Sequence, residues 1–133
     1  MSKDTVSLRS PLSRARGLGS AKDGVHHWIW QRLTAVALVP LTLWFVSSLV
    51  LMTGSDHASV TAWIARPHVA VLLPIFLATL LHHSQLGLQV VIEDYVHTRW
   101  INLSALLLAK FAHVLLAAAG IFAVLKIALG GTA

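Results

Sequence analysis

Three long apolar segments, separated by short polar stretches, divide this chain of 133 residues. The segments cover about residues 30–52, 68–92 and 102–128. A helix of about 20 apolar residues crosses a hydrocarbon core about 30 Å thick, so each segment is long enough to span a bilayer. The pattern therefore predicts an all-α membrane protein with three transmembrane helices, surrounded by lipid.

The polar stretches set the remaining boundaries. Residues 1–23 are rich in Ser, Arg, Gly and Lys, and we expect a mobile basic arm there, followed by a three-helix membrane domain over residues 24–133. The first helix should begin near His26, ahead of the apolar run. Residues 53–67 are predicted to form a polar loop, and residues 93–101 a short link between the second and third spans.

Positive charge predicts how the helices are oriented. Basic residues precede the first span, among them Arg9, Arg14, Arg16 and Lys22. Such residues favour the cytoplasmic side of a membrane, or the matrix side in a mitochondrion. With three spans, the N-terminus and the second link should face the cytoplasm and the C-terminus the opposite side. Arg66 and Lys126 on the far side give a weaker opposing signal.

Composition narrows the possible chemistry. Charged residues make up 11% of the chain, against about a quarter in soluble domains. The net charge of +5 is explained by the basic arm at a membrane surface, so we expect no nucleic-acid partner. Because there is no cysteine, disulfides, thiolate-bound iron–sulfur clusters and cysteine nucleophiles are excluded within this chain.

Ionisable residues inside a membrane span are costly and are therefore functional candidates. The second span contains His82 and His83, and the third contains Lys110 and His113. Histidine is a natural axial ligand of haem iron, and a haem between helices would account for an imidazole at the membrane midplane. His83 lies nine residues before the end of its span, about 14 Å deep, which is near the centre of the bilayer.

Spacing places other residues on the face of His83. Asp94 follows eleven residues later, about three helical turns, and Gly87 lies one turn from the histidine. The missing side chain at Gly87 would let a porphyrin or another helix approach closely. The simpler explanation of His83 is an interhelical hydrogen bond, but its combination with Gly87, Asp94 and Tyr95 favours a haem ligand.

The other candidates keep more than one interpretation. His82 points about 100° away from His83, so we expect it to be a structural hydrogen-bonding partner. His113 has a depth similar to that of His83 and could complete a bis-histidine site within this chain. Arg32, near His26 at the interface, could contact a haem propionate or simply extend toward lipid phosphates.

Three stretches carry a more specific signal: Gly24-Val25-His26, Arg32-Leu33-Thr34-Ala35, and His83-x3-Gly87-x6-Asp94-Tyr95. Together they resemble the small cytochrome b membrane-anchor subunit of succinate dehydrogenase, the SdhD family of respiratory complex II. The resemblance covers the transmembrane region. It implies a complex of four subunits, in which a flavoprotein subunit, an iron–sulfur subunit and a second cytochrome b anchor subunit are the partners.

The resemblance also implies roles for individual residues. His83 would be one axial ligand of haem b, the other coming from the second anchor subunit. Tyr95 and Asp94 would belong to the ubiquinone pocket, and Arg32 and His26 would lie near the haem propionates. The chain would have no catalysis of its own. It would reside in the bacterial inner membrane, or in the mitochondrial inner membrane if the source is eukaryotic.

Some positions depart from the family pattern or have no assigned role. His27 replaces an acidic residue, which argues against a proton-relay role there, and neither Glu93 nor Lys110 has an assigned function.

Two hypotheses from other classes remain. One is a self-contained b-type cytochrome that uses His83 and His113, and the other is a haem-free membrane scaffold with histidines that only join its helices.

Overall fold

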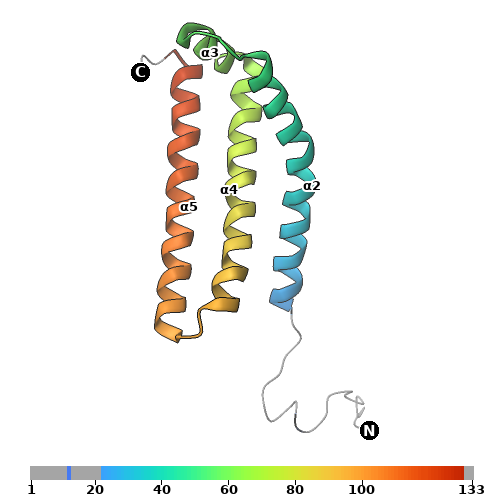
Figure 1. The fold of residues 1–133 in the computed structure, drawn as a ribbon, viewed down its shortest axis with the longest axis vertical. Helices are drawn as coiled ribbons and strands as arrows, with labels where there is room; N and C mark the ends of the chain where they lie inside the picture. Colours follow the sequence, from blue (N-terminus) through green and yellow to red (C-terminus); the bar gives the residue numbers. More distant parts are fainter. Residues whose placement is uncertain (1–11, 13–21, 131–133) are drawn as a thin grey trace, which may run out of the picture.

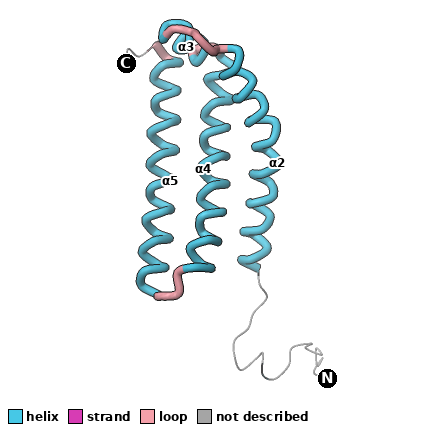
Figure 2. The backbone as a smooth tube through the Cα atoms, in the orientation of Figure 1, coloured by secondary structure: helices cyan, strands magenta, loops and turns pink. Residues whose placement is uncertain are grey.

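A computed structural model of the chain describes Leu12 and residues 22–130, and this part is helical with short connections (Figures 1 and 2). Its helices are α2 (Lys22–Leu51), α3 (His57–Ile64), α4 (Pro67–Tyr95) and α5 (Arg99–Ala128). Helices α2, α4 and α5 are long and apolar enough to cross a membrane. The prediction of three helices that can span a membrane is thus confirmed, and the orientation of the chain ends stays a prediction.

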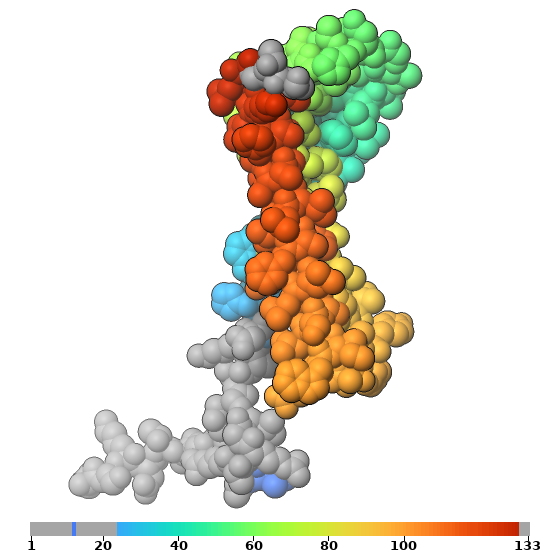
Figure 3. Space-filling model, turned by 90° about the vertical axis from the view of Figure 1, so that its left-hand side faces the viewer, coloured from blue at the N-terminus to red at the C-terminus, as the bar shows by residue number. Residues whose placement is uncertain are grey.

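The three long helices lie in a row rather than in a closed bundle (Figure 1). Helix α4 is in the middle and packs against both neighbours, whereas α2 and α5 do not pack against each other. Figure 3 views this row edge-on, with α5 in front. Each side of α4 therefore contacts a different helix, and side chains on its two sides enter different environments.

The ends of the row hold different parts of the chain (Figure 1). Lys22, the C-terminal end of α4 and the start of α5 lie together at one end. Helix α3 and Gly130 lie at the other end. We call the first the Tyr95 end and the second the α3 end. The predicted arm, residues 1–23, lies outside the described residues except for Leu12, Lys22 and Asp23.

The buried core is small and lies toward the α3 end. It consists of Val69, Leu73, Phe76 and Val124. Aromatic rings pack beside it: Phe45 stacks on Phe76 with centroids 4.8 Å apart, and Trp44 on Trp63 at 6.1 Å. Most other large apolar side chains are exposed. Because water would solvate such faces poorly, they are suited to contact lipid or partner chains.

The prediction of a loop over residues 53–67 is wrong in part, because α3 forms there. Asp56 caps this helix, and its Oδ1 accepts a hydrogen bond from the backbone N–H of Ser59 at 2.9 Å. Gly54, with φ +82°, makes the turn that precedes the cap. Hydrogen bonds from the Ser59 hydroxyl and backbone hold the pKa of Asp56 below its ordinary value.

The predicted link over residues 93–101 is shorter in the structure, spanning only residues 96–98. The Asn102 side chain explains this tight turn, because it donates hydrogen bonds to the carbonyls of Ile92 (3.2 Å) and Val96 (3.0 Å). The Ile92 carbonyl also accepts the backbone N–H of Val96 at 2.9 Å, so the Asn102 side chain adds a second bond there and gives the Val96 carbonyl, beyond the helix end, a partner. Asp94 and Tyr95 consequently lie in the last turn of α4 rather than in a loop.

Candidate functional site: an oriented histidine between α2 and α4

The imidazole of His83 is joined to α2 by a side-chain hydrogen bond. Its Nδ1 lies 2.9 Å from Oγ1 of Thr34, which is the buried polar residue of the described chain. The Thr34 hydroxyl also lies 2.7 Å from the carbonyl oxygen of Trp30. Because a carbonyl only accepts, the hydroxyl donates its proton to Trp30 and accepts one from Nδ1–H of His83. This bonding leaves Nε2 of His83 with a free lone pair.

The ring of His83 lines an apolar groove on the surface of α2. The other residues of the groove are Ala35, Leu38, Val39, Thr42 and Leu43. Except for the Thr42 hydroxyl these side chains are apolar, so the groove offers an apolar surface beside the imidazole. These properties fit the edge of a haem, which needs an axial nitrogen and an apolar surrounding. The role of His83 as a haem ligand stays a prediction.

Arg32 lies on the same face of α2 as the groove. It precedes Val39 by seven residues, which is two helical turns, so the two side chains project in similar directions. Its guanidinium lies 5.5 Å from the ring centre of Trp28. An exposed cation at the polar end of an apolar groove can pair with an anionic group of a ligand in the groove.

Gly87 faces the side chain of Gln31 on α2 rather than open space. A methyl group added at Gly87 would lie 3.8 Å from Nε2 of Gln31, which is an ordinary van der Waals distance, so the packing of α2 does not itself require glycine here. The nearest group to this position is therefore a side chain of α2 at an ordinary contact distance. Nε2 of His27 and Oε1 of Gln31 are buried here and have no hydrogen-bond partner among the described residues.

The remaining predicted site residues are exposed. Tyr95 has 79% of its surface accessible, and Asp94 beside it is also exposed at the end of α4. His26 is exposed on α2 at the same end of the row. No hydrogen bond within residues 22–130 joins these three side chains to one another. These three side chains are therefore accessible to other molecules.

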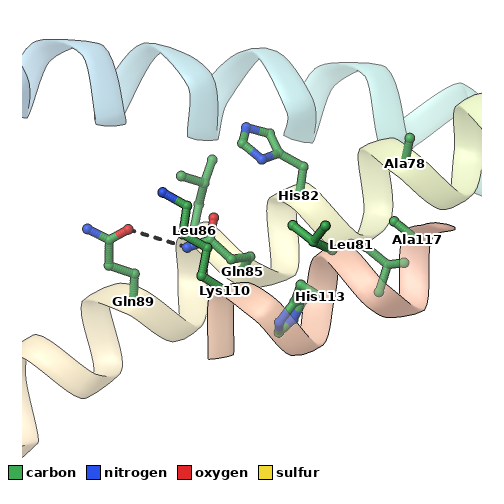
Figure 4. Close-up of a pocket in the computed structure, with 10 residues that line it drawn as sticks. Ala78, Leu81, His82, Gln85, Leu86, Gln89, Lys110, His113 and Ala117 are labelled. Carbon is green, nitrogen blue, oxygen red and sulfur yellow. Dashed lines mark hydrogen bonds between the residues drawn. The ribbon is translucent and has the colours of Figure 1, made fainter. Parts of the chain in front are cut away.

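The other two membrane histidines have different surroundings. His82 lies edge-on to Trp30, with centroids 5.9 Å apart, so an aromatic contact replaces the predicted hydrogen bond within the described chain. His113 on α5 lies with Nδ1 2.7 Å from the carbonyl oxygen of Ala109 and Nε2 3.4 Å from Oγ of Ser84. It lines a cavity between α4 and α5 that His83 does not line (Figure 4).

The separation of His83 and His113 bears on how a haem could be ligated. Each ring lines a different cavity, one at α2 and one at α5. A single iron needs both nitrogens on opposite sides of one macrocycle. The arrangement therefore argues against a bis-histidine site made by these two residues.

Thr34 is the functional candidate that residue-by-residue interpretation of the sequence missed. It stands in the Arg32–Ala35 stretch, but its hydroxyl has no charge and its position in an apolar run indicates no partner. Only its hydrogen bond with His83, 49 positions away, identifies it as a candidate for orienting that imidazole. An isolated hydroxyl two residues after an interfacial arginine is the one local signal available.

These features define a class: a multi-span helical membrane protein with an oriented imidazole deep in one span and polar side chains at one end of the helices. Residues 7–122 match the family described as succinate dehydrogenase/fumarate reductase transmembrane subunit. The chain belongs to this family.

Individual relatives agree with the family match. The chain is 36% identical over 120 residues to the succinate dehydrogenase hydrophobic membrane anchor subunit of Rickettsia bellii, covering 90% of this chain and 96% of the relative. It is 30% identical over 122 residues to the subunit of the same name from Paracoccus denitrificans, covering 91% and 93%. No solved structure matches the chain. The predicted family resemblance is confirmed.

Proposed function

We propose that this chain is the hydrophobic membrane anchor subunit of a succinate dehydrogenase, and that it helps to bind haem b and to form the ubiquinone-reducing site. The proposal is supported by the family match and by relatives that carry the name of this subunit. The observation that carries the haem assignment is the Thr34–His83 hydrogen bond, which leaves one imidazole nitrogen free beside an apolar groove.

In this proposal His83 is one axial ligand of haem b, through Nε2. The second ligand comes from the second cytochrome b anchor subunit, because His113 lines another cavity. Arg32 and His26 pair with the haem propionates at the Tyr95 end of the groove. When bound, haem b supplies an acceptor and donor of single electrons within the membrane.

Tyr95 and Asp94 form the part of the ubiquinone pocket that this chain supplies. Reduction of a quinone takes two electrons and two protons, so negative charge develops on a carbonyl oxygen. The phenol of Tyr95 donates a hydrogen bond to that oxygen, and the carboxylate of Asp94 relays protons from water. Their exposure agrees with a pocket that partner subunits complete.

The partners follow from the same assignment. A flavoprotein subunit oxidises succinate, and an iron–sulfur subunit carries the electrons to the quinone at the membrane. The basic arm places the Tyr95 end on the cytoplasmic side of a bacterial inner membrane, or on the matrix side in a mitochondrion. The chain anchors and completes the site without catalysis of its own.

A difference spectrum tests the proposal. The full chain is tagged, purified in mild detergent with its partners, oxidised, and then given succinate. A b-type haem band reduced by succinate is expected. His83→Ala should remove or shift this band, whereas His82→Ala, one residue away and in contact with Trp30, should change it less.

The other outcomes distinguish the alternatives. A haem band that dithionite reduces but succinate does not would favour a self-contained cytochrome or a different complex. An intact preparation without haem would leave the haem-free membrane scaffold as the remaining hypothesis. A larger spectral loss in His82→Ala than in His83→Ala would show that the wrong ligand has been assigned.

A further inference from the structure

We propose that the cavity between α4 and α5 binds one acidic phospholipid, with its phosphate at Lys110 and an acyl chain along the two helices. The cavity has a volume of about 360 Å³ and lies on the side of α4 away from the His83 groove (Figure 4). It plays no part in the haem and quinone assignments above, and the proposal does not depend on them.

The lining of this cavity changes from polar to apolar along the helices. Gln89, Gln85 and Lys110 lie toward the Tyr95 end, and Ala78 and Ala117 lie at the other end of the cavity (Figure 4). His82 and His113 come between them. Positions 78 to 89 of α4 span about 16 Å along the helix axis. A ligand that fits this lining has one polar end, one apolar end and a long axis parallel to the helices.

Depth in the membrane places the polar end near the lipid head groups. Helices of about 30 residues are about 45 Å long, so each end of a helix projects about 7 Å beyond a core 30 Å thick. Gln89 lies six residues before the end of α4, about 9 Å from that end and thus just inside the core. The Lys110 side chain extends toward Gln89, and its flexible stem lets the ammonium reach the same level (Figure 4).

Lys110 is exposed, so its ammonium can pair with an anion from outside the described chain. Within residues 24–130 no salt bridge neutralises this ammonium. The carboxylate of Glu93, one turn beyond Gln89, accepts a hydrogen bond from Nε2 of Gln89 at 2.8 Å. Gln85 in turn donates to Oε1 of Gln89 at 3.5 Å. A phosphate beside Lys110 would neutralise a charge that is costly to leave unpaired at this depth.

A phospholipid fits these observations better than the other candidate ligands. Basic pockets between membrane helices bind anionic head groups. The apolar half of the cavity, toward the α3 end, runs parallel to the helices, as an acyl chain does. A carboxylate from a partner helix would satisfy Lys110 but would leave the apolar half unfilled. A quinone head group has no charge to pair with the ammonium.

Native mass spectrometry of the intact complex tests the proposal. The complex is stripped of lipid and incubated with equal amounts of phosphatidylglycerol and phosphatidylcholine of different masses. One phosphatidylglycerol per copy of the chain should be retained in preference to phosphatidylcholine. Lys110→Gln should reduce this preference about fivefold. Lys126→Gln, the same change in the last turn of α5 at the α3 end, should leave it unchanged.

A second variant tests the apolar half of the cavity. Ala117→Leu should lower the binding of both lipids regardless of head group, because its side chain fills the space for the acyl chain. Equal loss of preference in Lys110→Gln and Lys126→Gln would overturn the proposal, as would displacement of the lipid by ubiquinone. Loss of the partner subunits in Lys110→Gln, with Ala117→Leu binding lipid normally, would instead identify a partner carboxylate.

Discussion

Thr34 and His83, 49 residues apart in the sequence, are joined by a hydrogen bond of 2.9 Å between α2 and α4. The bond orients the imidazole and assigns its protonated nitrogen, because the Thr34 hydroxyl proton is already donated to the Trp30 carbonyl. Histidines that bind metals nearly always donate their other N–H to such a partner. The pair therefore connects the packing of two membrane helices with the proposed ligation of haem b.

Thr34→Val should weaken haem binding by about 10-fold to 100-fold, because it removes the acceptor of Nδ1–H while keeping the shape of the side chain. Thr34→Ser keeps the hydroxyl and should restore binding. The haem content and spectrum of the purified complex measure both variants. Thr42→Val, in the same groove, serves as the control. Equal haem loss in Thr34→Val and Thr42→Val would show that the groove, and not the hydrogen bond, matters.

Tyr95→Phe should slow quinone reduction about 100-fold while leaving assembly and haem intact, because a hydrogen-bond donor to the charged oxygen is lost. The side chain is 79% exposed in this chain, so little packing energy changes. The measurement compares succinate oxidation with ubiquinone against that with a soluble artificial acceptor. Rates that are equal for wild type and variant with both acceptors would remove Tyr95 from the pocket.

Gly87→Ala should be tolerated, whereas Gly120→Ala should destabilise the helix packing. A methyl group at Gly87 meets Nε2 of Gln31 at an ordinary 3.8 Å, but one at Gly120 lies 3.3 Å from Cδ1 of Leu77. Leu77 is partly buried and packs against the core, so displacing its side chain disturbs that packing and we expect a cost of about 1–3 kcal/mol.

Thermal unfolding of the complex in detergent ranks the two glycine variants, and the haem spectrum adds an independent test. Gly87→Ala should leave this spectrum unchanged, since the glycine faces Gln31 and does not line the His83 groove. A shifted spectrum in Gly87→Ala would mean that the macrocycle approaches α4 at this position after all.

Acidification should loosen α3 through protonation of its cap. The pKa of Asp56 is lowered in the folded chain by the hydrogen bonds from Ser59. The charged carboxylate therefore stabilises the fold above its ordinary pKa, and this contribution is lost as the pH falls below about 4. Trp63, in α3, stacks on Trp44, so its fluorescence should report the change.

Asp56→Asn is the matched control for this pH dependence. Asparagine is also a good N-cap but does not titrate in this range, so α3 should form in the variant without the acid transition. An identical transition in wild type and Asp56→Asn would assign it to another group.

The row of helices explains how far the sequence could predict this protein. The three spans, their order and the depth of His83 follow from local properties, namely the length of each apolar run and the rise of a helix. The family resemblance also depends on short stretches whose spacing is visible in the sequence. Helix α3 was missed because its eight residues are too few for a periodic signal, and its formation depends on the Asp56 cap.

Other features depend on how each helix is rotated about its axis, and the hydrophobic pattern does not specify this rotation. In a membrane, lipid and protein neighbours are both apolar, so a span can be apolar all round without indicating which face packs inward. The tertiary structure decided that His83 is hydrogen-bonded to Thr34, that Gly87 faces Gln31, and that His113 lies on the other side of α4. The sequence by itself determined the three long apolar runs and, from their length, which residues we expect near the membrane midplane. Only the packing of α4 between α2 and α5 decided which of them meet, because such contacts join residues that are distant in the chain.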